Sequence, residues 1–436
     1  IKEGIYTDKE LNEKVRRVLR LTFRTAMNND RPWGSMVSDA HKTACRKIGE
    51  EGIVLLQNNA NLLPINLSKV KRIAVIGENA IKMMTVGGGS SSLKVKYEVT
   101  PLEGLKKRIG EQAEIIYARG YVGDPTGEYN GVKTGQNLKD DRSPKELRTE
   151  ALQVASNADI VLFIGGLNKS EYQDCEGTDR KTMDLPYNQN ELIMDLLQVN
   201  KKLVVINISG TGVAMPWKNH VSTILQAWYL GSETGNALAS ILMGDVNPSG
   251  KLPYTYYACL NQCGAHKLGE YPGHKGMDVL GNKVYDIPYN EGLFVGYRFI
   301  DKNKLKPNFP FGHGLSYTTF EYGKAKVNSK AIEKSEKLYI TIPITNTGNR
   351  AGAEVVQLYI KCLNSSVIRP IKELKGFCKV ELQPNETKEI SFTITAEELS
   401  FFDEKQHKWI AEPGKFEALM ASSSADIRSK VCFELK

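Results

Sequence analysis

The chain has 436 residues, of which 41% are hydrophobic and 25% are charged, and its formal net charge is +8. This length exceeds what one ordinary core holds and predicts two or three domains. No run approaches the roughly 18 apolar residues of a membrane-spanning helix, and an odd number of scattered cysteines excludes a disulfide framework. The chain begins with Ile and no apolar signal region follows, so we expect a processed or truncated chain.

The first segment, 8–27, has the pattern of an amphipathic helix. Its apolar positions share one side and its basic residues the other, namely Lys14, Arg16, Arg17, Arg20 and Arg24. Nucleic-acid binding is one interpretation of that charge. A solvated helix face is favoured, since no nucleic-acid motif accompanies it. After a connector at 28–34, a second helix is expected from the N-cap Ser38 to Gly52.

Strand-like apolar runs then alternate with helical stretches. The predicted strands are 72–77, 113–117, 160–165, 203–208 and 223–228, and the predicted helices are 101–109, 144–157, 187–199 and 233–243. Nearly continuous apolar strands separated by helices are typical of a largely parallel sheet that is covered on both faces. We therefore expect a doubly wound α/β sandwich domain over residues 37–258.

The stretch 259–320 is rich in Gly, Pro, Tyr and His and predicts extended connecting loops. It contains a group of soft metal ligands, Cys259, Cys263, His266 and His274. Zinc is one interpretation of this group. The spacing matches no standard ligand pattern, so a metal-free loop is favoured and no metal or cofactor is expected.

The last part of the chain, 321–436, changes pattern. Short alternating strands are predicted at 337–344, 354–360, 377–382, 388–394, 415–420 and 430–435. About 110 residues of such strands with turn signals between them are typical of a β-sandwich of the fibronectin type III kind. The fold class is therefore α/β followed by all-β.

A loop crowded with carboxylates follows the apolar strand at 160–165. It holds Glu171, Asp174, Glu176, Asp179 and Asp184, with Arg180 placed to pair with one of them. Open α/β sheets bind ligands at the carboxyl ends of their strands, and carboxylates there suit general acid/base chemistry. The alternative is a solvated acidic loop with caps and a local salt bridge. Crowding of negative charge would raise the pKa of a proton donor.

Several ordered stretches resemble the carboxyl-terminal half of glycoside hydrolase family 3, the β-glucosidase and β-xylosidase family. They are Gly-Ile-Val-Leu-Leu-Gln-Asn at 52–58 with Leu-Leu-Pro at 62–64, the Gly-rich stretch 86–91 with 99–104, the acidic loop, 244–253, Phe-Pro-Phe-Gly-His-Gly at 309–314, and Glu-Leu-Lys-Gly-Phe at 373–377. The set spans nearly the whole chain. Such enzymes begin with a (β/α)₈-type barrel, of which residues 1–36 resemble only the tail and linker.

The resemblance assigns roles to residues. Glu176-Gly177-Thr178-Asp179-Arg180 matches the family's Glu-Gly-x-Asp-Arg pattern, so Glu176 is the expected acid/base, with Glu171 as the alternative. Asp179 and Arg180 are expected to orient the loop. The family's nucleophile is an aspartate on the barrel, and it is missing here. Asp39 resembles its context superficially but is interpreted as a capping-turn residue.

Gly88, Gly89 and Ser90 belong to the Gly-rich stretch that follows a predicted strand. A phosphate or dinucleotide site is one interpretation, but the spacing and a P-loop lysine are lacking. A tight loop that borders the sugar site, close to the acidic loop, is favoured. His313 is expected to be a structural hydrogen-bonding residue. Trp33, Trp217 and Trp228 are expected in the core, with sugar stacking as the alternative.

The favoured function is that of part of a retaining exo-acting β-glycosidase, most simply a β-glucosidase acting on terminal non-reducing β-D-glucosyl residues of oligosaccharides. The chain would supply the acid/base to its own upstream barrel domain, and the isolated fragment is expected to be inactive. The alternative is a non-catalytic module that binds carbohydrate or a partner. A nucleotide-dependent enzyme is disfavoured. The resemblance implies a periplasmic or secreted protein and leaves a homodimer open.

Overall fold

The computed structural model describes residues 3–85, 88–90, 92–123, 128–129, 132–133 and 135–436. Its contacts divide the chain into two units, residues 1–43 and 44–436. The sequence-based domain limits at 36, 258 and 320 remain a prediction. Within the described part, no helix is long and apolar enough to cross a membrane.

The first unit contains helix α1 (Asp8–Arg24), which ends three residues before the predicted limit. Its start is fixed by a capping box, in which the Thr7 hydroxyl accepts from the Glu10 amide at 3.3 Å and the Glu10 carboxylate accepts from the Thr7 amide at 2.8 Å. None of the residues of α1 is buried. Within the described residues of the first unit, the apolar side of this amphipathic helix is therefore not covered.

Helix α2 (Asp39–Gly52) begins where the sequence predicts. The Ser38 hydroxyl accepts from the His41 amide at 3.3 Å, as expected of an N-cap, and Asp39 forms an ion pair of 2.8 Å with Lys42 in the first turn. Asp39 is thus a residue of the helix start, consistent with its capping-turn interpretation.

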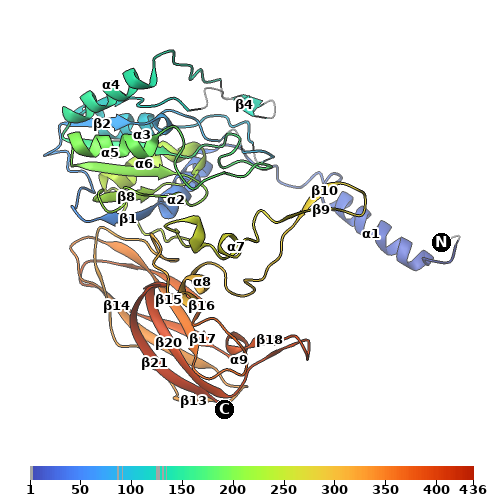
Figure 1. The fold of residues 1–436 in the computed structure, drawn as a ribbon. Coiled ribbons are helices and arrows are strands. Elements are labelled where there is room, and N and C mark those ends of the chain that lie inside the picture. The colour runs from blue at the N-terminus through green and yellow to red at the C-terminus, as the bar shows by residue number, and fades with distance from the viewer. Residues whose placement is uncertain (1–2, 86–87, 91, 124–127, 130–131, 134) are drawn as a thin grey trace. The chain divides into compact units, whose positions relative to one another are not determined.

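A six-stranded sheet forms the centre of the α/β part of the second unit (Figure 1). Its strands lie in the order β1-β8-β7-β6-β2-β3. Its strands are β1 (Val54–Asn58), β8 (Thr223–Gln226), β7 (Leu203–Ile208), β6 (Ile160–Gly166), β2 (Arg72–Ile76) and β3 (Glu114–Ala118). All neighbours are parallel except β1, which runs antiparallel to β8. The predicted strands are confirmed, and β1 is an edge strand that the sequence pattern did not assign.

Helices cover both faces of this sheet. One core contains residues of α4 (Pro144–Ser156) and α5 (Gln189–Val199), and the other contains residues of α3 (Pro101–Ile109) and α6 (Thr234–Met243). Neighbouring strand residues alternate between the two cores, as Val161 and Leu162 do. Both faces of each central strand are therefore buried, which explains the continuous apolar runs and confirms the doubly wound architecture.

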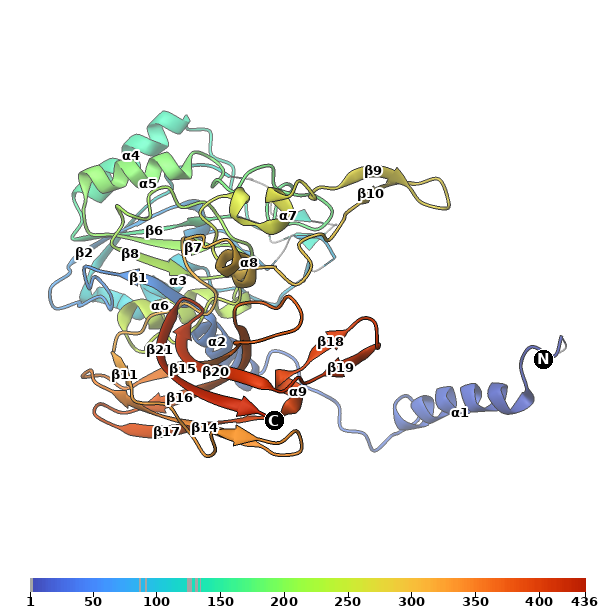
Figure 2. The same ribbon diagram turned by 60° about the horizontal axis from the view of Figure 1, so that its bottom comes forward.

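The connecting stretch contains more regular structure than the extended loops expected from its composition. It forms α7 (Gly264–Lys267), the hairpin β9 (His274–Met277) and β10 (Lys283–Asp286), and α8 (Tyr297–Lys302) (Figure 2). The hairpin is an isolated two-stranded ladder without a buried face, and for that reason it lacks the apolar alternation by which strands are predicted.

The last part is a β-sandwich, as predicted. One sheet contains β11 (Phe320–Tyr322), β12 (Lys326–Val327), β14 (Leu338–Asn346) and β17 (Thr387–Ile394). The other contains β13 (Ala331–Ile332), β15 (Gly352–Cys362), β16 (Glu373–Leu382), β20 (Gly414–Ser423) and β21 (Asp426–Leu435). A single core fills the space between them. The short β11–β13 strands and the β18 (Phe401–Asp403) and β19 (Lys408–Ile410) hairpin were not predicted.

Candidate active site

The acidic loop leaves the sheet at the carboxyl end of β6, in the position that the sequence predicts. Gly166 closes the strand with φ +124°, and a Cβ there would lie 2.2 Å from the Ile208 carbonyl oxygen. Only glycine fits this close approach of two strand ends. The loop that follows, 167–188, therefore starts from a fixed point beside β7.

Asp174 ties the loop to neighbouring strand ends and carries no free carboxylate. Its two oxygens accept from the Gly210 amide at 2.6 Å, the Thr211 hydroxyl at 2.5 Å and the Tyr229 hydroxyl at 2.9 Å. Burial, together with the Asp174 carboxylate, raises the pKa of Tyr229, so the phenol stays a donor. Asp174 is an anchor of the loop.

Glu176 lies at the exposed tip of the loop and faces the Gly-rich stretch. Its Oε2 accepts from the Ser90 amide at 2.7 Å and from the Ser90 hydroxyl at 2.6 Å, and its own amide donates to the Gly88 carbonyl at 2.9 Å. Gly89 has φ +106°, and a Cβ there would lie 2.4 Å from the Glu176 Cβ. Gly88, Gly89 and Ser90 thus form the seat of this carboxylate; Val86, Gly87 and Ser91 lie outside the described residues.

The pKa of Glu176 shifts in the opposite direction to that expected. The two hydrogen bonds from Ser90 stabilise the charged carboxylate and lower its pKa below the ordinary value. No neighbouring carboxylate contributes to this shift, and Asp174 and Asp179 turn to partners of their own. The charge density of the sequence was a poor guide here, since it does not specify side-chain direction.

Asp179 and Arg180 also have separate partners. Asp179 accepts a hydrogen bond from the Tyr271 hydroxyl, and Arg180 Nη2 donates to the Gly212 carbonyl at 2.5 Å. The predicted pairing of Arg180 with a loop carboxylate is therefore wrong. Arg180 Nη1 is buried and has no hydrogen-bond partner among the described residues. Glu171 is exposed and, among the described residues, forms no hydrogen bond with the seat of Glu176.

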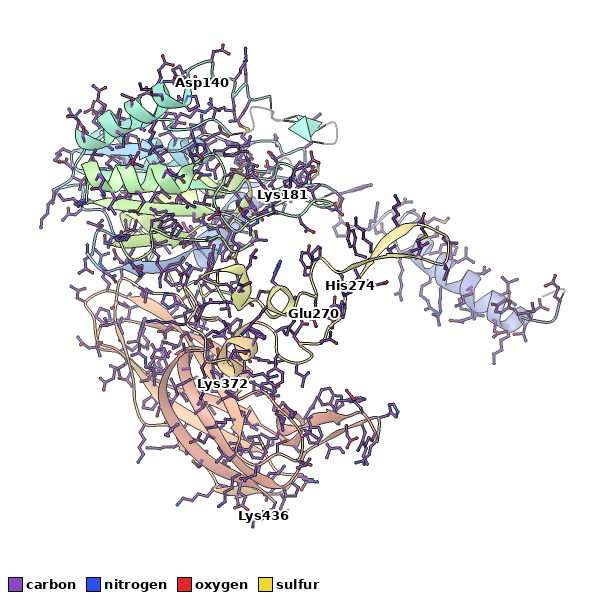
Figure 3. The ribbon with its side chains drawn as sticks, in the orientation of Figure 1. Asp140, Lys181, Glu270, His274, Lys372 and Lys436 are labelled. Carbon is purple, nitrogen blue, oxygen red and sulfur yellow. The ribbon has the colours of Figure 1, made fainter. Side chains whose placement is uncertain are left out.

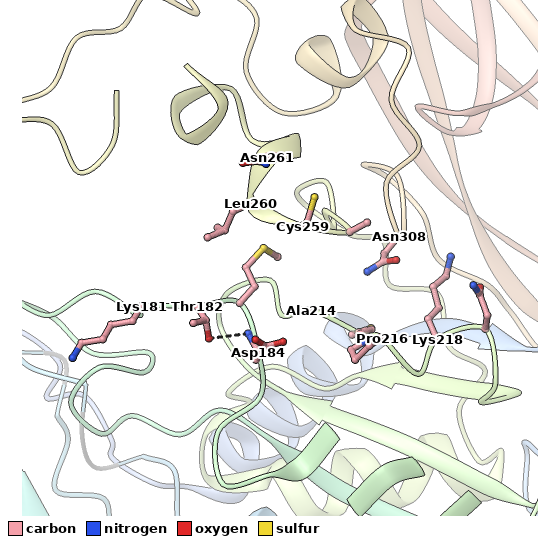
Figure 4. Close-up of a pocket in the computed structure, with 14 residues that line it drawn as sticks. Lys181, Thr182, Asp184, Ala214, Pro216, Lys218, Cys259, Leu260, Asn261 and Asn308 are labelled. Atoms are coloured by element: carbon pink, nitrogen blue, oxygen red, sulfur yellow. Dashed lines mark hydrogen bonds between the residues drawn. The ribbon is translucent and has the colours of Figure 1, made fainter. Parts of the chain in front are cut away.

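A pocket of about 650 Å³ opens beside the continuation of the loop (Figure 4). Its walls come from Lys181–Asp184, from the segment 214–219 after β7, and from 258–261 with Asn308. Thr182 accepts from the Asp184 amide at 3.2 Å on its rim. The pocket was not predicted from the sequence, because its walls come from segments that are distant in the chain.

The other side chains singled out from the sequence are a histidine, three tryptophans and a group of possible metal ligands. His313 is partly buried and its Nε2 lies 2.8 Å from the Leu56 carbonyl oxygen, which is consistent with the expected structural role. Trp217 is fully buried and Trp228 partly buried, but Trp33 is 83% exposed, so its core assignment is wrong. Among the described residues no three His, Cys, Asp or Glu side chains converge as metal ligands, and Cys259 lies exposed at the pocket.

Comparison with known proteins places this arrangement in a family. The model of the glycosyl hydrolase family 3 C-terminal domain matches residues 53–317, and that of the fibronectin type III-like domain matches residues 354–424. The chain is 46% identical, over its whole length, to Beta-glucosidase BoGH3A of Bacteroides ovatus. It is 34% identical over 98% of its length to Periplasmic beta-glucosidase of Salmonella typhimurium.

Solved structures agree with this placement. A β-glucosidase from Kluyveromyces marxianus superposes on the whole chain with a TM-score of 0.85 at 28% identity, and the chain covers 67% of it. A family 3 β-glucosidase from Bifidobacterium adolescentis gives 0.84 at 32% identity, with 59% of it covered. The chain spans 57% and 56% of the two curated relatives named above. This chain therefore belongs to glycoside hydrolase family 3 and corresponds to the carboxyl-terminal portion of its members.

Proposed function

We propose that the chain is the acid/base-bearing portion of a retaining exo-acting β-glycosidase that hydrolyses terminal non-reducing β-D-glucosyl residues of oligosaccharides. The observation that carries the proposal is the Glu176 carboxylate, held by Ser90 at the exposed carboxyl edge of the sheet without a cation among the described residues. The relatives named as β-glucosidases support the glucoside over the xyloside, and the relative named as periplasmic supports a site outside the cytoplasm.

A retaining glycosidase needs two carboxyl groups about 5–5.5 Å apart, one as nucleophile and one as proton donor. Glu176 is the proton donor, and an upstream barrel outside this chain supplies the nucleophile. The donor must be protonated when substrate binds, whereas Ser90 favours the charged form here. A second carboxylate brought opposite Glu176 would raise its pKa and leave the proton in place for the leaving oxygen.

The test is hydrolysis of an aryl β-glucoside by the complete polypeptide, wild type against Glu176→Ala. Because a positioned proton donor contributes about 10²–10⁴-fold, a rate loss of that size is expected. Azide, or a leaving group that needs no proton, should restore the rate. Glu171→Ala is the matched control, because this exposed carboxylate lies on the same loop.

Full activity of Glu176→Ala together with loss in Glu171→Ala would move the role to Glu171. A complete wild-type polypeptide that binds glucosides but hydrolyses none would favour the non-catalytic binding module. The chain alone is expected to give no turnover, since it lacks the barrel nucleophile; robust hydrolysis by pure chain would contradict that expectation.

A further inference from the structure

Tyr271 connects the acidic loop to the connecting segment. Its hydroxyl donates to Asp179 Oδ2, and the carboxylate raises the pKa of Tyr271 to about 12, so the phenol remains a donor. The His266 ring lies edge-on against the Tyr271 ring, with centroids 5.2 Å apart. Tyr271 is therefore held on one side by α7 and reaches the loop on the other.

The other ties of the acidic loop come from the α/β domain. Asp174 is bound by the ends of β7 and β8, Arg180 by the Gly212 carbonyl, and Glu176 by the Gly-rich stretch. Asp179 lies three residues beyond Glu176, on the exposed part of the loop between the Glu176 seat and the Arg180 tie. Among the described residues, the hydrogen bond that the Asp179 side chain accepts is the one from Tyr271.

Glu270, the residue before Tyr271, is itself held in place by neighbouring groups. Glu270 is 3% exposed and accepts from the Asn290 amide at 3.1 Å (Figure 3). Hydrogen bonding to the Glu270 carboxyl, followed by burial, raises the pKa of Glu291. The Oε2 atoms of both glutamates are buried and have no hydrogen-bond partner among the described residues. Two facing carboxyl groups satisfy each other when one carries a proton. The pair lies at the base of the β9–β10 arm, residues 271–290. It holds the backbone next to Tyr271 in position.

We propose that Tyr271 is a positioning residue for the acid/base: through Asp179 it holds the tip of the loop, and thereby Glu176, in the orientation that protonates the leaving oxygen. This inference rests on the proposed function of Glu176. It adds a residue that lies 92 positions beyond Asp179 and outside the Glu-Gly-x-Asp-Arg pattern. Tyr271 itself touches no reacting atom in this assignment.

The test uses the complete polypeptide carrying Tyr271→Phe, which removes only the hydroxyl. Displacement of a proton donor by about 1 Å costs up to about 10²-fold, so kcat/KM for a phenyl glucoside, a poor leaving group, should fall 10- to 100-fold. The kcat/KM for a 2,4-dinitrophenyl glucoside covers only the steps up to release of a leaving group that needs no proton, so it should stay within about twofold of wild type. Tyr289→Phe, at an exposed tyrosine of the same arm, is the matched control and should match wild type on both substrates.

A double-mutant cycle and a structural readout sharpen the result. Asp179→Ala should resemble Tyr271→Phe on both substrates, and the double variant should lose no more than either single one, because both remove the same contact. Amide hydrogen exchange of residues 171–180 should rise in Tyr271→Phe and stay unchanged in Tyr289→Phe.

Equal losses on both substrates, or additive losses in the double variant, would overturn the positioning role. So would a Tyr271→Phe variant with wild-type rates and exchange. Failure of the underlying function is distinguished by Glu176→Ala: if that variant keeps full activity on the phenyl glucoside, the acid/base assignment falls first. If it loses activity while Tyr271→Phe does not, only the present inference falls.

Discussion

Two glutamates at the carboxyl edge of the same sheet lie in opposite surroundings. The Glu78 side chain, after β2, is 1% exposed, forms an ion pair of 2.7 Å with Arg119 and accepts from the Gly123 amide at 2.6 Å. Glu176, after β6, is exposed and its carboxylate accepts from Ser90, with no cation paired to it among the described residues. The buried Glu78 carboxylate is bound to a cation and serves the fold. The pKa of the exposed Glu176 carboxylate can be changed by a group brought opposite it.

The largest effect is expected where the buried pair is broken. Arg119→Met leaves Glu78 buried without its cation, which should lower the free energy of unfolding of the α/β domain by about 3–5 kcal/mol. Urea denaturation measures the loss. The double variant Arg119→Met/Glu78→Gln should recover part of it, since the unpaired charge is gone. A loss as small as that of an exposed ion pair would remove the contrast between the two glutamates.

Substitutions around the exposed Glu176 should change the rate of hydrolysis and leave the free energy of unfolding nearly unchanged. Gly89→Ala places a Cβ 2.4 Å from the Glu176 Cβ and 2.5 Å from its Oε2, so the carboxylate must leave its seat. Aryl glucoside hydrolysis by the complete polypeptide should fall about 10²-fold. Gly177→Ala is the matched control, because Gly177 also has positive φ, +83°, but a Cβ there meets nothing within 4 Å. Equal rates in the two variants would mean that the seat has no role in catalysis.

A smaller change should alter the proton affinity of Glu176 without moving the loop. Ser90→Ala removes the hydroxyl hydrogen bond, the larger of the causes that lower the pKa of Glu176. The pKa should therefore rise, and the alkaline limb of the pH–rate profile should move to higher pH, because the acid form persists longer. Carbon-13 NMR titration of the Glu176 carboxyl, assigned by its absence in Glu176→Gln, measures the pKa directly. A fall in the pKa would contradict the assignment of the hydrogen bonds.

The smallest effect is expected at the glutamate pair that clamps the arm. The hydrogen bond with Glu270, followed by burial, raises the pKa of Glu291. For a raised pKa, the stabilising contribution is complete below the ordinary glutamate value and is lost as pH rises through the folded-state value. Glu291→Gln keeps a hydrogen-bond donor at every pH. The midpoint temperature of thermal unfolding should therefore lose this part of its decline as the pH rises. Identical pH profiles for variant and wild type would exclude the shared proton.

The fold was largely predictable because buried positions require apolar residues, and these form a recognisable pattern in the sequence. The strands β2, β6 and β7 are covered on both faces, so their apolar runs are nearly continuous, and the sandwich strands alternate because one face of each sheet packs on the core. The β9–β10 hairpin was missed because it has no buried face to impose a pattern. Trp33 was misplaced for a related reason: an aromatic side chain is commonly buried, but the sequence does not say what covers it.

The candidate site was predictable in part. The position of the acidic loop and its closeness to the Gly-rich stretch follow from sheet topology, since strand ends meet at one edge. The direction of each carboxylate does not, because Asp174 and Asp179 are turned by Thr211, Tyr229 and Tyr271, all distant in the sequence. That is why the direction of the Glu176 pKa shift was predicted with the wrong sign.

Helix α1 has a practical consequence for work with this polypeptide. The exposed apolar side chains along it include Leu11, Val15, Val18, Leu19, Leu21 and Phe23. Within the described residues of the first unit nothing covers these side chains, and an exposed apolar patch is an aggregation liability in water. Preparations that begin at residue 1 should self-associate as the protein concentration rises, whereas a version trimmed to start near Ser38 should stay monodisperse and crystallise more readily.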